Sequence, residues 1–277
     1  MGSGAMLKPT GPNLSRPKIR PGHWGHLCYD EQSAPTSAGA RAVTLVPASA
    51  VERERRRRRI TRTARQSANR TWLVTGAVGL VGFLVLALLL ELGASIDQFD
   101  HRVLAAVISA REPNLTLLAR AASLLGSAGA RVGLAIAGAV LLWLRTRRFL
   151  LPVALLAAVA ATVSLVTILK IALDRSRPPA NLVLGAPPTD KAFPSGHAAG
   201  GSVAVILIAL LLGLTATKPF VRRLLVIIGC LLALLIGWSR SYLGDHWPTD
   251  VLAGWFLAAV MVSVTMALVT ETAPPQQ

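Results

Sequence analysis

The chain has 277 residues, of which 53% are apolar and 15% are charged, with 29 Lys and Arg against 13 Asp and Glu. This composition excludes an ordinary soluble globular protein and is typical of a membrane protein with several spans. Its two cysteines, Cys28 and Cys230, exclude a disulfide framework. His23 and His26 lie close to Cys28, but their Pro- and Gly-rich setting favours a chance grouping. We therefore expect no metal site and no cofactor.

Residues 1–70 form a basic segment with 14 Lys and Arg against 4 Asp and Glu. Gly, Pro, Ser and Thr are scattered through it without a period, and it has no apolar face long enough to bury, so we expect disorder. It ends in the run 52–59, Glu-Arg-Glu and five arginines, whose composition would let it lengthen into a helix. We expect no signal peptide, because the first apolar segment begins only at Trp72.

The run 52–59 has three interpretations. It fixes the orientation of the chain in the membrane, or it attracts anionic lipid head groups, or it binds nucleic acid. We favour the first, with lipid attraction as a by-product, and expect no nucleic-acid partner.

Six apolar segments have the length and composition of membrane-spanning helices. They lie at about residues 72–92, 130–146, 150–172, 197–215, 222–241 and 248–270. We therefore predict an all-α fold, in which residues 71–271 form a six-helix membrane bundle and residues 272–277 form a short tail. Residues 93–129 carry too many charges to span and are predicted to form short helices at the membrane interface.

Basic residues predict the orientation of the bundle. They gather at 53–70, 145–148 and 218–223, and six alternating spans place all three clusters on one side. By the positive-inside rule that side is the cytoplasm. Both termini are therefore expected in the cytoplasm, and the loops at 174–196 and 241–247 are expected outside.

Three short polar motifs interrupt the apolar sequence. The first is Lys170, six residues, then Arg177-Pro178; the second is Pro194-Ser195-Gly196-His197; the third is Ser239-Arg240, five residues, His246, three residues and Asp250. Each alone has a plain structural interpretation: a lysine that reaches the interface, a helix cap, or a polar interfacial turn. Together they supply three cations, a hydroxyl-bearing turn before a helix and two imidazoles. This combination indicates a site for a phosphate ester.

The third motif predicts a pair of functional side chains. If a helix starts near Trp247, Asp250 lies one turn beyond His246 and its carboxylate reaches the imidazole. Such a carboxylate fixes the tautomer and leaves the other ring nitrogen free to attack or to carry a proton. In the first motif, Asp174 and Arg175 are expected to be solvated loop charges.

The three motifs resemble those of the type 2 phosphatidic acid phosphatase family, whose superfamily also includes soluble acid phosphatases and vanadium-dependent haloperoxidases. The resemblance covers roughly residues 72–270. It implies that His246 is the nucleophile and forms a phosphohistidine, that Asp250 orients it, and that His197 protonates the leaving oxygen. The residues that it implies for holding the phosphoryl oxygens are Lys170, Arg177, Ser195, Gly196 and Arg240.

The expected function is that of a metal-independent lipid phosphatase in the membrane, with its site on the outer face. Its expected partners are membrane lipids and a lipid phosphate: a polyprenyl diphosphate, phosphatidic acid or a phosphatidylglycerol phosphate. Two alternatives stay open, a lipid phosphotransferase that passes the phosphoryl group to an alcohol, and a catalytically silent phospholipid-binding protein. A vanadate-dependent peroxidase is disfavoured by the membrane framework. The sequence leaves the oligomeric state open.

Overall fold

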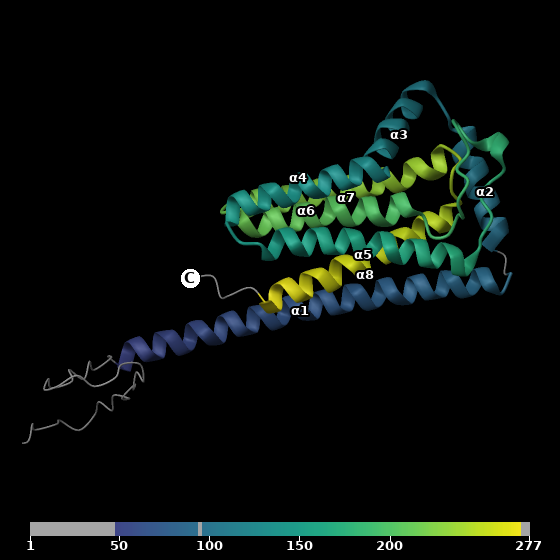
Figure 1. Cartoon of the computed structure of the whole chain (residues 1–277). Helices are drawn as coiled ribbons and strands as arrows, with labels where there is room; N and C mark the ends of the chain where they lie inside the picture. The colour runs from purple at the N-terminus through teal and green to yellow at the C-terminus, as the bar shows by residue number, and fades with distance from the viewer. Residues whose placement is uncertain (1–47, 94–95, 273–277) are drawn as a thin grey trace, which may run out of the picture. The chain divides into compact units, whose positions relative to one another are not determined.

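The computed structural model describes residues 48–93 and 96–272. All regular structure in these two ranges is helical, which confirms the predicted all-α fold (Figure 1). The α-helices are α1 (Ala48–Glu91), α2 (Ile96–Ser109), α3 (Pro113–Gly126), α4 (Ala128–Thr146), α5 (Leu150–Leu173), α6 (Ser202–Thr215), α7 (Pro219–Tyr242) and α8 (Pro248–Thr272). Two short turns, the 3₁₀-helical η1 (Ala180–Leu182) and the π-helical η2 (His197–Gly201), lie between α5 and α6.

Six helical segments are long and apolar enough to cross a membrane, as the sequence predicts. They are Arg65–Glu91 within α1, then α4, α5, the continuous segment His197–Thr215, α7 and α8. Large apolar side chains on these segments are exposed, for example Leu73, Ile168 and Leu231. Exposed apolar faces are expected of helices that lipid surrounds, because lipid tails are as apolar as the side chains.

Helices α2 and α3 confirm that the charged segment between the first two spans forms short helices; their location at the membrane interface stays a prediction. Each has 14 residues, whereas a span needs roughly 20. Helix α2 nevertheless buries two side chains, Asp100 and Leu104. A fully buried carboxylate requires a partner, and the partner of Asp100 lies in the site described below.

The expected disorder does not extend to residues 48–70, because α1 begins at Ala48 and continues into the first span. Arginine and glutamate are good helix formers, so the basic run prolongs the apolar helix that follows it. Residues 1–47 and 273–277 lie outside the described residues, so the disorder and the short tail predicted there stay predictions.

The chain forms two compact units, Met1–Thr63 and Ala64–Gln277, and the second contains the whole bundle. Its main core, between α4, α5, α6 and α8, includes Leu142, Leu207 and Met266. Helix α1 approaches α8 at Gly79, where an added Cβ atom would lie 2.8 Å from the carbonyl oxygen of Phe256. Only glycine permits that approach, so a small residue at this position packs two helices together.

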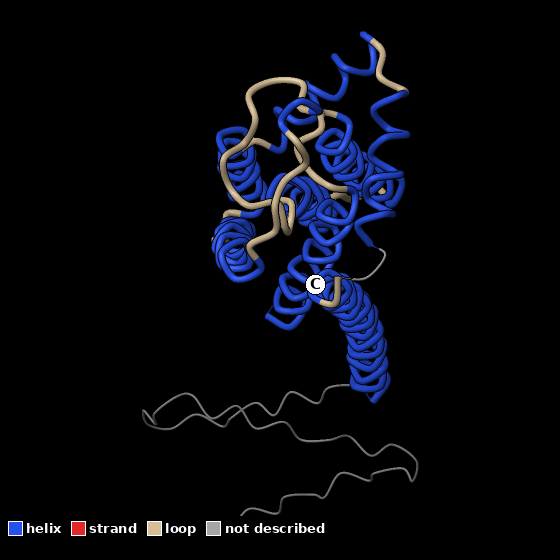
Figure 2. The backbone as a smooth tube through the Cα atoms, turned by 90° about the vertical axis from the view of Figure 1, so that its right-hand side faces the viewer, coloured by secondary structure: helices blue, strands red, loops and turns tan. Residues whose placement is uncertain are grey.

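The loops that join α5 to η2 and α7 to α8 lie at the same end of the bundle, beside α2 (Figures 1 and 2). They contact each other directly, since the Leu184 N–H donates to the Leu243 carbonyl at 2.8 Å. The connections that carry Arg147 and Lys218 lie at the opposite end (Figure 1). All three motifs therefore lie at the end of the bundle away from these basic turns.

Candidate active site

Backbone hydrogen bonds join the three motifs at the loop end of the bundle. The Ser195 N–H donates to the Asp250 carbonyl at 3.0 Å, which ties the second motif to the third. The Ala192 N–H donates to the Arg175 carbonyl at 2.9 Å, which ties the first motif to the chain just before the second. Segments far apart in the sequence thus form one continuous site.

His246 and Asp250 form the pair that their spacing predicts. His246 is 1% exposed, and its Nδ1 lies 3.4 Å from Oδ2 of Asp250. The same oxygen accepts the Trp247 N–H at 2.9 Å, which fixes the carboxylate at the start of α8. Burial lowers the pKa of His246 well below its ordinary value, and the charges of Arg177 and Lys170 lower it further. The imidazole is therefore neutral.

Arg177 identifies the tautomer of His246. Its Nη1 lies 3.2 Å from His246 Nε2, and a guanidinium has donors only. Nε2 therefore accepts, and the single ring proton lies on Nδ1, facing Asp250. In this tautomer the lone pair that attacks an electrophile is on Nε2.

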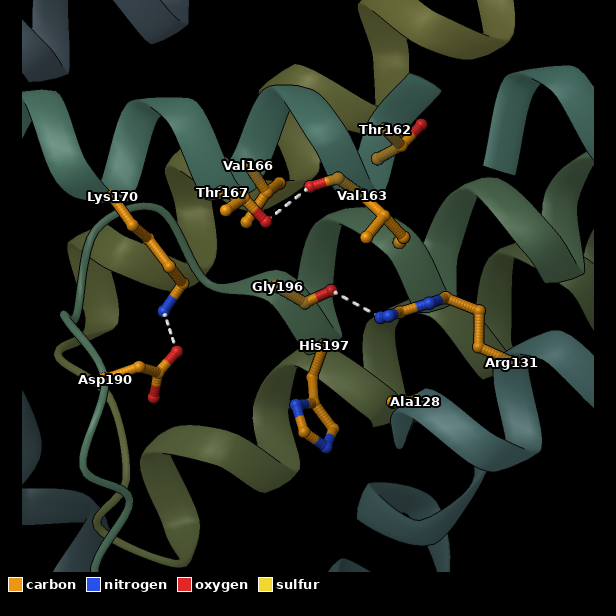
Figure 3. Close-up of a pocket in the computed structure, with 11 residues that line it drawn as sticks. Ala128, Arg131, Thr162, Val163, Val166, Thr167, Lys170, Asp190, Gly196 and His197 are labelled. Carbon is orange, nitrogen blue, oxygen red and sulfur yellow. Dashed lines mark hydrogen bonds and ion pairs between the residues drawn. The ribbon is translucent and has the colours of Figure 1, made fainter. Parts of the chain in front are cut away.

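Lys170 and Arg177 together hold the carboxylate of Asp190. Lys170 Nζ lies 2.8 Å from Oδ2, and Arg177 Nη2 lies 2.6 Å from Oδ1. Figure 3 shows the pair of Lys170 and Asp190. Burial raises the pKa of Asp190, but the hydrogen bond and charge of Lys170, together with Arg177, outweigh burial and hold this pKa at about 2. Two anionic oxygens thus bind two cations, as two phosphoryl oxygens would. Asp190 is not among the site residues predicted from the sequence, because nothing near it in the sequence distinguishes it from other loop residues.

Arg240 is at the site, but its charge is already paired. It is 7% exposed, its Nη2 lies 2.7 Å from Oδ2 of Asp245, and its Nη1 donates to Ser123 Oγ. Burial raises the pKa of Asp245, although Arg240 and Arg177 lower it. Among the described residues, the buried Nε of Arg240 has no hydrogen-bond partner. The Arg240 carbonyl also accepts the His246 N–H at 3.3 Å, so this arginine fixes the turn that carries the histidine.

The second motif forms the turn into η2. Ser195 is fully buried, and its Oγ accepts the Ala198 N–H at 3.4 Å, the helix-cap contact of the plain structural interpretation. The Gly196 carbonyl accepts from Arg131 Nη1 at 3.2 Å (Figure 3). His197 begins η2 and is half-buried. The sequence did not single out Arg131, which reaches the turn from α4.

A cavity of about 200 Å³ lies between α4, α5 and η2 (Figure 3). His197 and Lys170, from different motifs, both line it, as does Asp190. Helix α5 contributes an apolar wall that includes Val163 and Val166. The cavity therefore combines three polar residues of the site, Lys170, Asp190 and His197, with a surface suited to an apolar chain.

Arg175 lies in a buried network, which corrects the expectation of a solvated loop charge. Its side chain is 12% exposed, with Nη1 2.6 Å from Asp250 Oδ1 and Nη2 2.6 Å from Asp100 Oδ2. Asp174 is 69% exposed and pairs with Lys191, as expected of a solvated charge. Asp100 comes from α2, 75 positions before Arg175. The sequence around Arg175 therefore gives no sign of its partner.

The site as a whole combines a neutral, oriented imidazole with cations that already hold an anionic group. Such a set can bind an oxyanion, attack it with Nε2 of His246 and protonate a leaving group from His197. Across residues 48–93 and 96–272, no three or more His, Cys, Asp or Glu side chains are grouped as ligands for a metal ion.

A family model described as PAP2 superfamily matches residues 151–273, which hold α5 to α8 and all three motifs. Over residues 151–273 the chain is therefore similar to the PAP2 superfamily. The resemblance seen in the sequence is thereby confirmed. Helix α2 and its Asp100 lie outside the matched residues.

Two curated relatives align with part of the chain. It is 37% identical over 87 residues to an undecaprenyl-diphosphatase of Sulfolobus acidocaldarius, covering 31% of this chain and 37% of the relative. It is 38% identical over 72 residues to phosphatidylglycerophosphatase B of Bacillus subtilis, covering 25% and 34%. The chain thus spans about a third of the length of these relatives.

A solved structure shares the PAP2 fold over most of the chain. It is the transmembrane PAP2-type phosphatidylglycerolphosphate phosphatase from Bacillus subtilis, with a TM-score of 0.68 and 23% identity. The match covers 73% of this chain and 99% of that one. The six-helix arrangement is therefore a known fold.

Proposed function

We propose that this protein is a membrane lipid phosphatase that hydrolyses a phosphate ester or a diphosphate of a lipid through a phosphohistidine on His246. The observation that carries the proposal is the position of His246 Nε2 beside Arg177, which with Lys170 already holds an anionic group. In the free protein this group is the Asp190 carboxylate, and the substrate's phosphoryl group replaces it. Similarity to the PAP2 superfamily over residues 151–273 and the named activities of the relatives support the proposal.

In the first step, Nε2 of His246 forms a bond to phosphorus while the bond from phosphorus to the leaving oxygen breaks. His197, which lines the same cavity as Lys170, gives its proton to the leaving oxygen. Lys170, Arg177 and Arg240 balance the charge that develops on the non-bridging oxygens. Among the residues that the structure describes, Arg240 Nε has no hydrogen-bond partner, so we assign this donor to the purpose; its Nη2 pairs with Asp245.

In the second step, water attacks the phosphohistidine, the bond from nitrogen to phosphorus breaks and inorganic phosphate leaves. His197 lost its proton in the first step and now accepts one from the water. Asp250 stays against Nδ1 and stabilises the positive charge on the phosphorylated ring. We assign the Ser195 hydroxyl and the Gly196 turn to hold a phosphoryl oxygen at the start of η2.

The proposed substrate is a lipid because the site lies at the end of a membrane bundle and its cavity has an apolar wall on α5. Three lipid classes are candidates: a polyprenyl diphosphate, a phosphatidylglycerol phosphate and phosphatidic acid. The first two correspond to the names of the relatives. We place the site outside the cytoplasm, because the basic turns at Arg147 and Lys218 lie at the other end of the bundle.

Phosphate release by the full chain, purified in detergent, tests the proposal. The three lipid classes are supplied separately in excess EDTA, and His246→Ala serves as the matched control. We expect release from at least one lipid in EDTA, since side chains supply the positive charge, and none from the variant. Activity that EDTA abolishes and Mg²⁺ restores would contradict the assigned chemistry, and binding of a lipid phosphate without turnover would favour a silent binding protein.

The same assay distinguishes a hydrolase from a phosphotransferase. A lipid alcohol added in increasing amounts competes with water for the phosphohistidine. A hydrolase releases inorganic phosphate at an unchanged yield, whereas a phosphotransferase converts that yield into a phosphorylated alcohol.

A further inference from the structure

Helix α2 supplies a buried carboxylate to the start of α8. The side chain of Asp100 is 1% exposed, and its Oδ1 accepts the Thr249 N–H at 2.9 Å. The Thr249 hydroxyl also donates to Oδ2 of Asp100. The first N–H groups of a helix lack partners within the helix, so a carboxylate at this position stabilises the start of α8.

Arg175 bridges this carboxylate to Asp250. One terminal nitrogen, Nη2, lies 2.6 Å from Asp100, and the other, Nη1, lies 2.6 Å from Asp250. Nη1 also donates to Thr249 Oγ1 at 2.8 Å. Burial lowers the pKa of Arg175, but the charges and hydrogen bonds of the two carboxylates raise it above its ordinary value. The guanidinium is therefore a permanent cation with its fork fixed between two buried anions.

Because Arg175 binds Oδ1 of Asp250, it determines the direction in which Oδ2 of the same carboxylate points. Oδ1 of Asp250 binds Arg175, while Oδ2 accepts the Trp247 N–H and lies 3.4 Å from His246 Nδ1. The ring of Trp247 lies against the same guanidinium, 5.8 Å from its carbon, and its Nε1–H donates to the Ser176 carbonyl at 3.0 Å. With both oxygens fixed, the carboxylate cannot turn away from the imidazole.

We propose that Arg175, held by Asp100, is a positioning residue of the active site: it orients Asp250 and through it Nε2 of the His246 nucleophile. This inference rests on the proposed function, because His246 must act as a nucleophile for its orientation to affect a rate. It also extends the catalytic apparatus to α2, outside the part of the chain that matches the superfamily.

Kinetics separate this role from a merely structural one. Arg175→Met removes the bridge but leaves Lys170 and Arg177 to bind phosphate. We expect kcat to fall on the order of 10- to 100-fold, the range seen when outer partners of a functional histidine are removed, with KM changed less than about threefold. Asp100→Asn should give an intermediate loss. Asp97→Asn is the matched control: it lies on the same helix, is 72% exposed and is 3.5 Å from Arg175, and should keep kcat within about twofold.

The decisive measurement is kcat of the double variant, Arg175→Met with Asp250→Asn. If Arg175 acts through Asp250, Arg175→Met should change kcat by less than about twofold when Asp250 is already asparagine. If the fold-decreases in kcat of the Arg175→Met and Asp250→Asn single variants multiply in the double variant, the two residues act independently and the inference is overturned. If Arg175→Met does not elute as a single species from detergent size exclusion, the same comparison is made with Arg175→Lys, which keeps the charge but loses the fork.

The outcomes also separate this inference from the proposed function. An active wild type with unchanged kcat in Arg175→Met and Asp100→Asn overturns the positioning role alone. A folded wild type that releases no phosphate from any of the three lipid classes overturns the proposed function and the positioning role together.

Discussion

Arg177 donates to the ring nitrogen of His246 that we assign as the nucleophile, at 3.2 Å. Arg177 also binds Asp190, so the cation that contacts this nitrogen also holds the anion that we propose the phosphoryl group replaces. When a phosphoryl group replaces Asp190, the electrophile and the nucleophile meet at one guanidinium. Much of the geometry needed for attack is thus present before the substrate arrives.

The two histidines should respond differently to removal. His246→Ala eliminates the attacking nitrogen and should abolish the phosphoenzyme, with a loss of about 10⁴-fold or more on every substrate. His197→Ala removes only the acid. It should cost on the order of 10²- to 10⁴-fold with a lipid monophosphate, whose alkoxide needs a proton, and far less with p-nitrophenyl phosphate.

The measurement for this pair is kcat on both substrates, with acid-stable and base-stable phosphate on the protein counted separately. If His197→Ala loses kcat equally on the two substrates, His197 is not the acid and acts only as a phosphate ligand. Phosphoenzyme in His246→Ala would move the nucleophile to another residue.

Asp190→Asn should strengthen phosphate binding. The carboxylate competes with the substrate for Lys170 and Arg177, so its neutral replacement should lower KM and the inhibition constant of vanadate by about three- to tenfold, the usual strength of such an ion pair. Asp174→Asn is the matched control, since this carboxylate binds Lys191 instead. A higher KM in Asp190→Asn would show that the carboxylate holds the cations in place for the substrate.

The stability of the protein should decrease as the pH is lowered, in part because of His246. The folded protein keeps this imidazole neutral, so the unfolded chain takes up the proton first as the pH falls below about 6.5. Each further pH unit below that value should lower the free energy of unfolding by up to about 1.4 kcal/mol, until the pH reaches the lowered pKa of the folded state. Apparent Tm between pH 7 and pH 5 should therefore fall less in His246→Gln than in wild type. Parallel Tm curves would contradict a buried neutral His246.

Cysteine labelling in intact cells should place Asn181 outside and Arg147 and Lys218 inside. All three are exposed, so a single cysteine at each, after replacement of Cys28 and Cys230, is open to an impermeant reagent. We predict labelling at position 181 only, because the basic turns mark the cytoplasmic side. Labelling at 147 without labelling at 181 would reverse the orientation. Asp245, in the loop between α7 and α8, is buried and so is unsuited to this test.

Most of the candidate site could be predicted from the three motifs, but its internal pairing could not. The spacing from His246 to Asp250 is one helical turn, so local geometry alone brings their side chains together. The partners of Arg175 and Arg177 arise from packing: Asp100 comes from α2, and Asp190 comes from a loop without regular structure. No periodicity in the sequence links such residues.

The sequence by itself determined the six spans and grouped most of the candidate site residues in three motifs, but it did not indicate Asp190, Arg131 or the burial of Arg175. A span is set by the thickness of the hydrocarbon layer, which requires an apolar run of about 20 residues that any sequence shows directly. The tertiary structure alone decided that Arg175 is buried rather than solvated, that Arg240 pairs with Asp245, and that Lys170 and Arg177 share the Asp190 carboxylate. These contacts join residues far apart in the sequence, and a buried charge such as Arg175 or Arg240 is stable only where the fold brings an opposite charge near it.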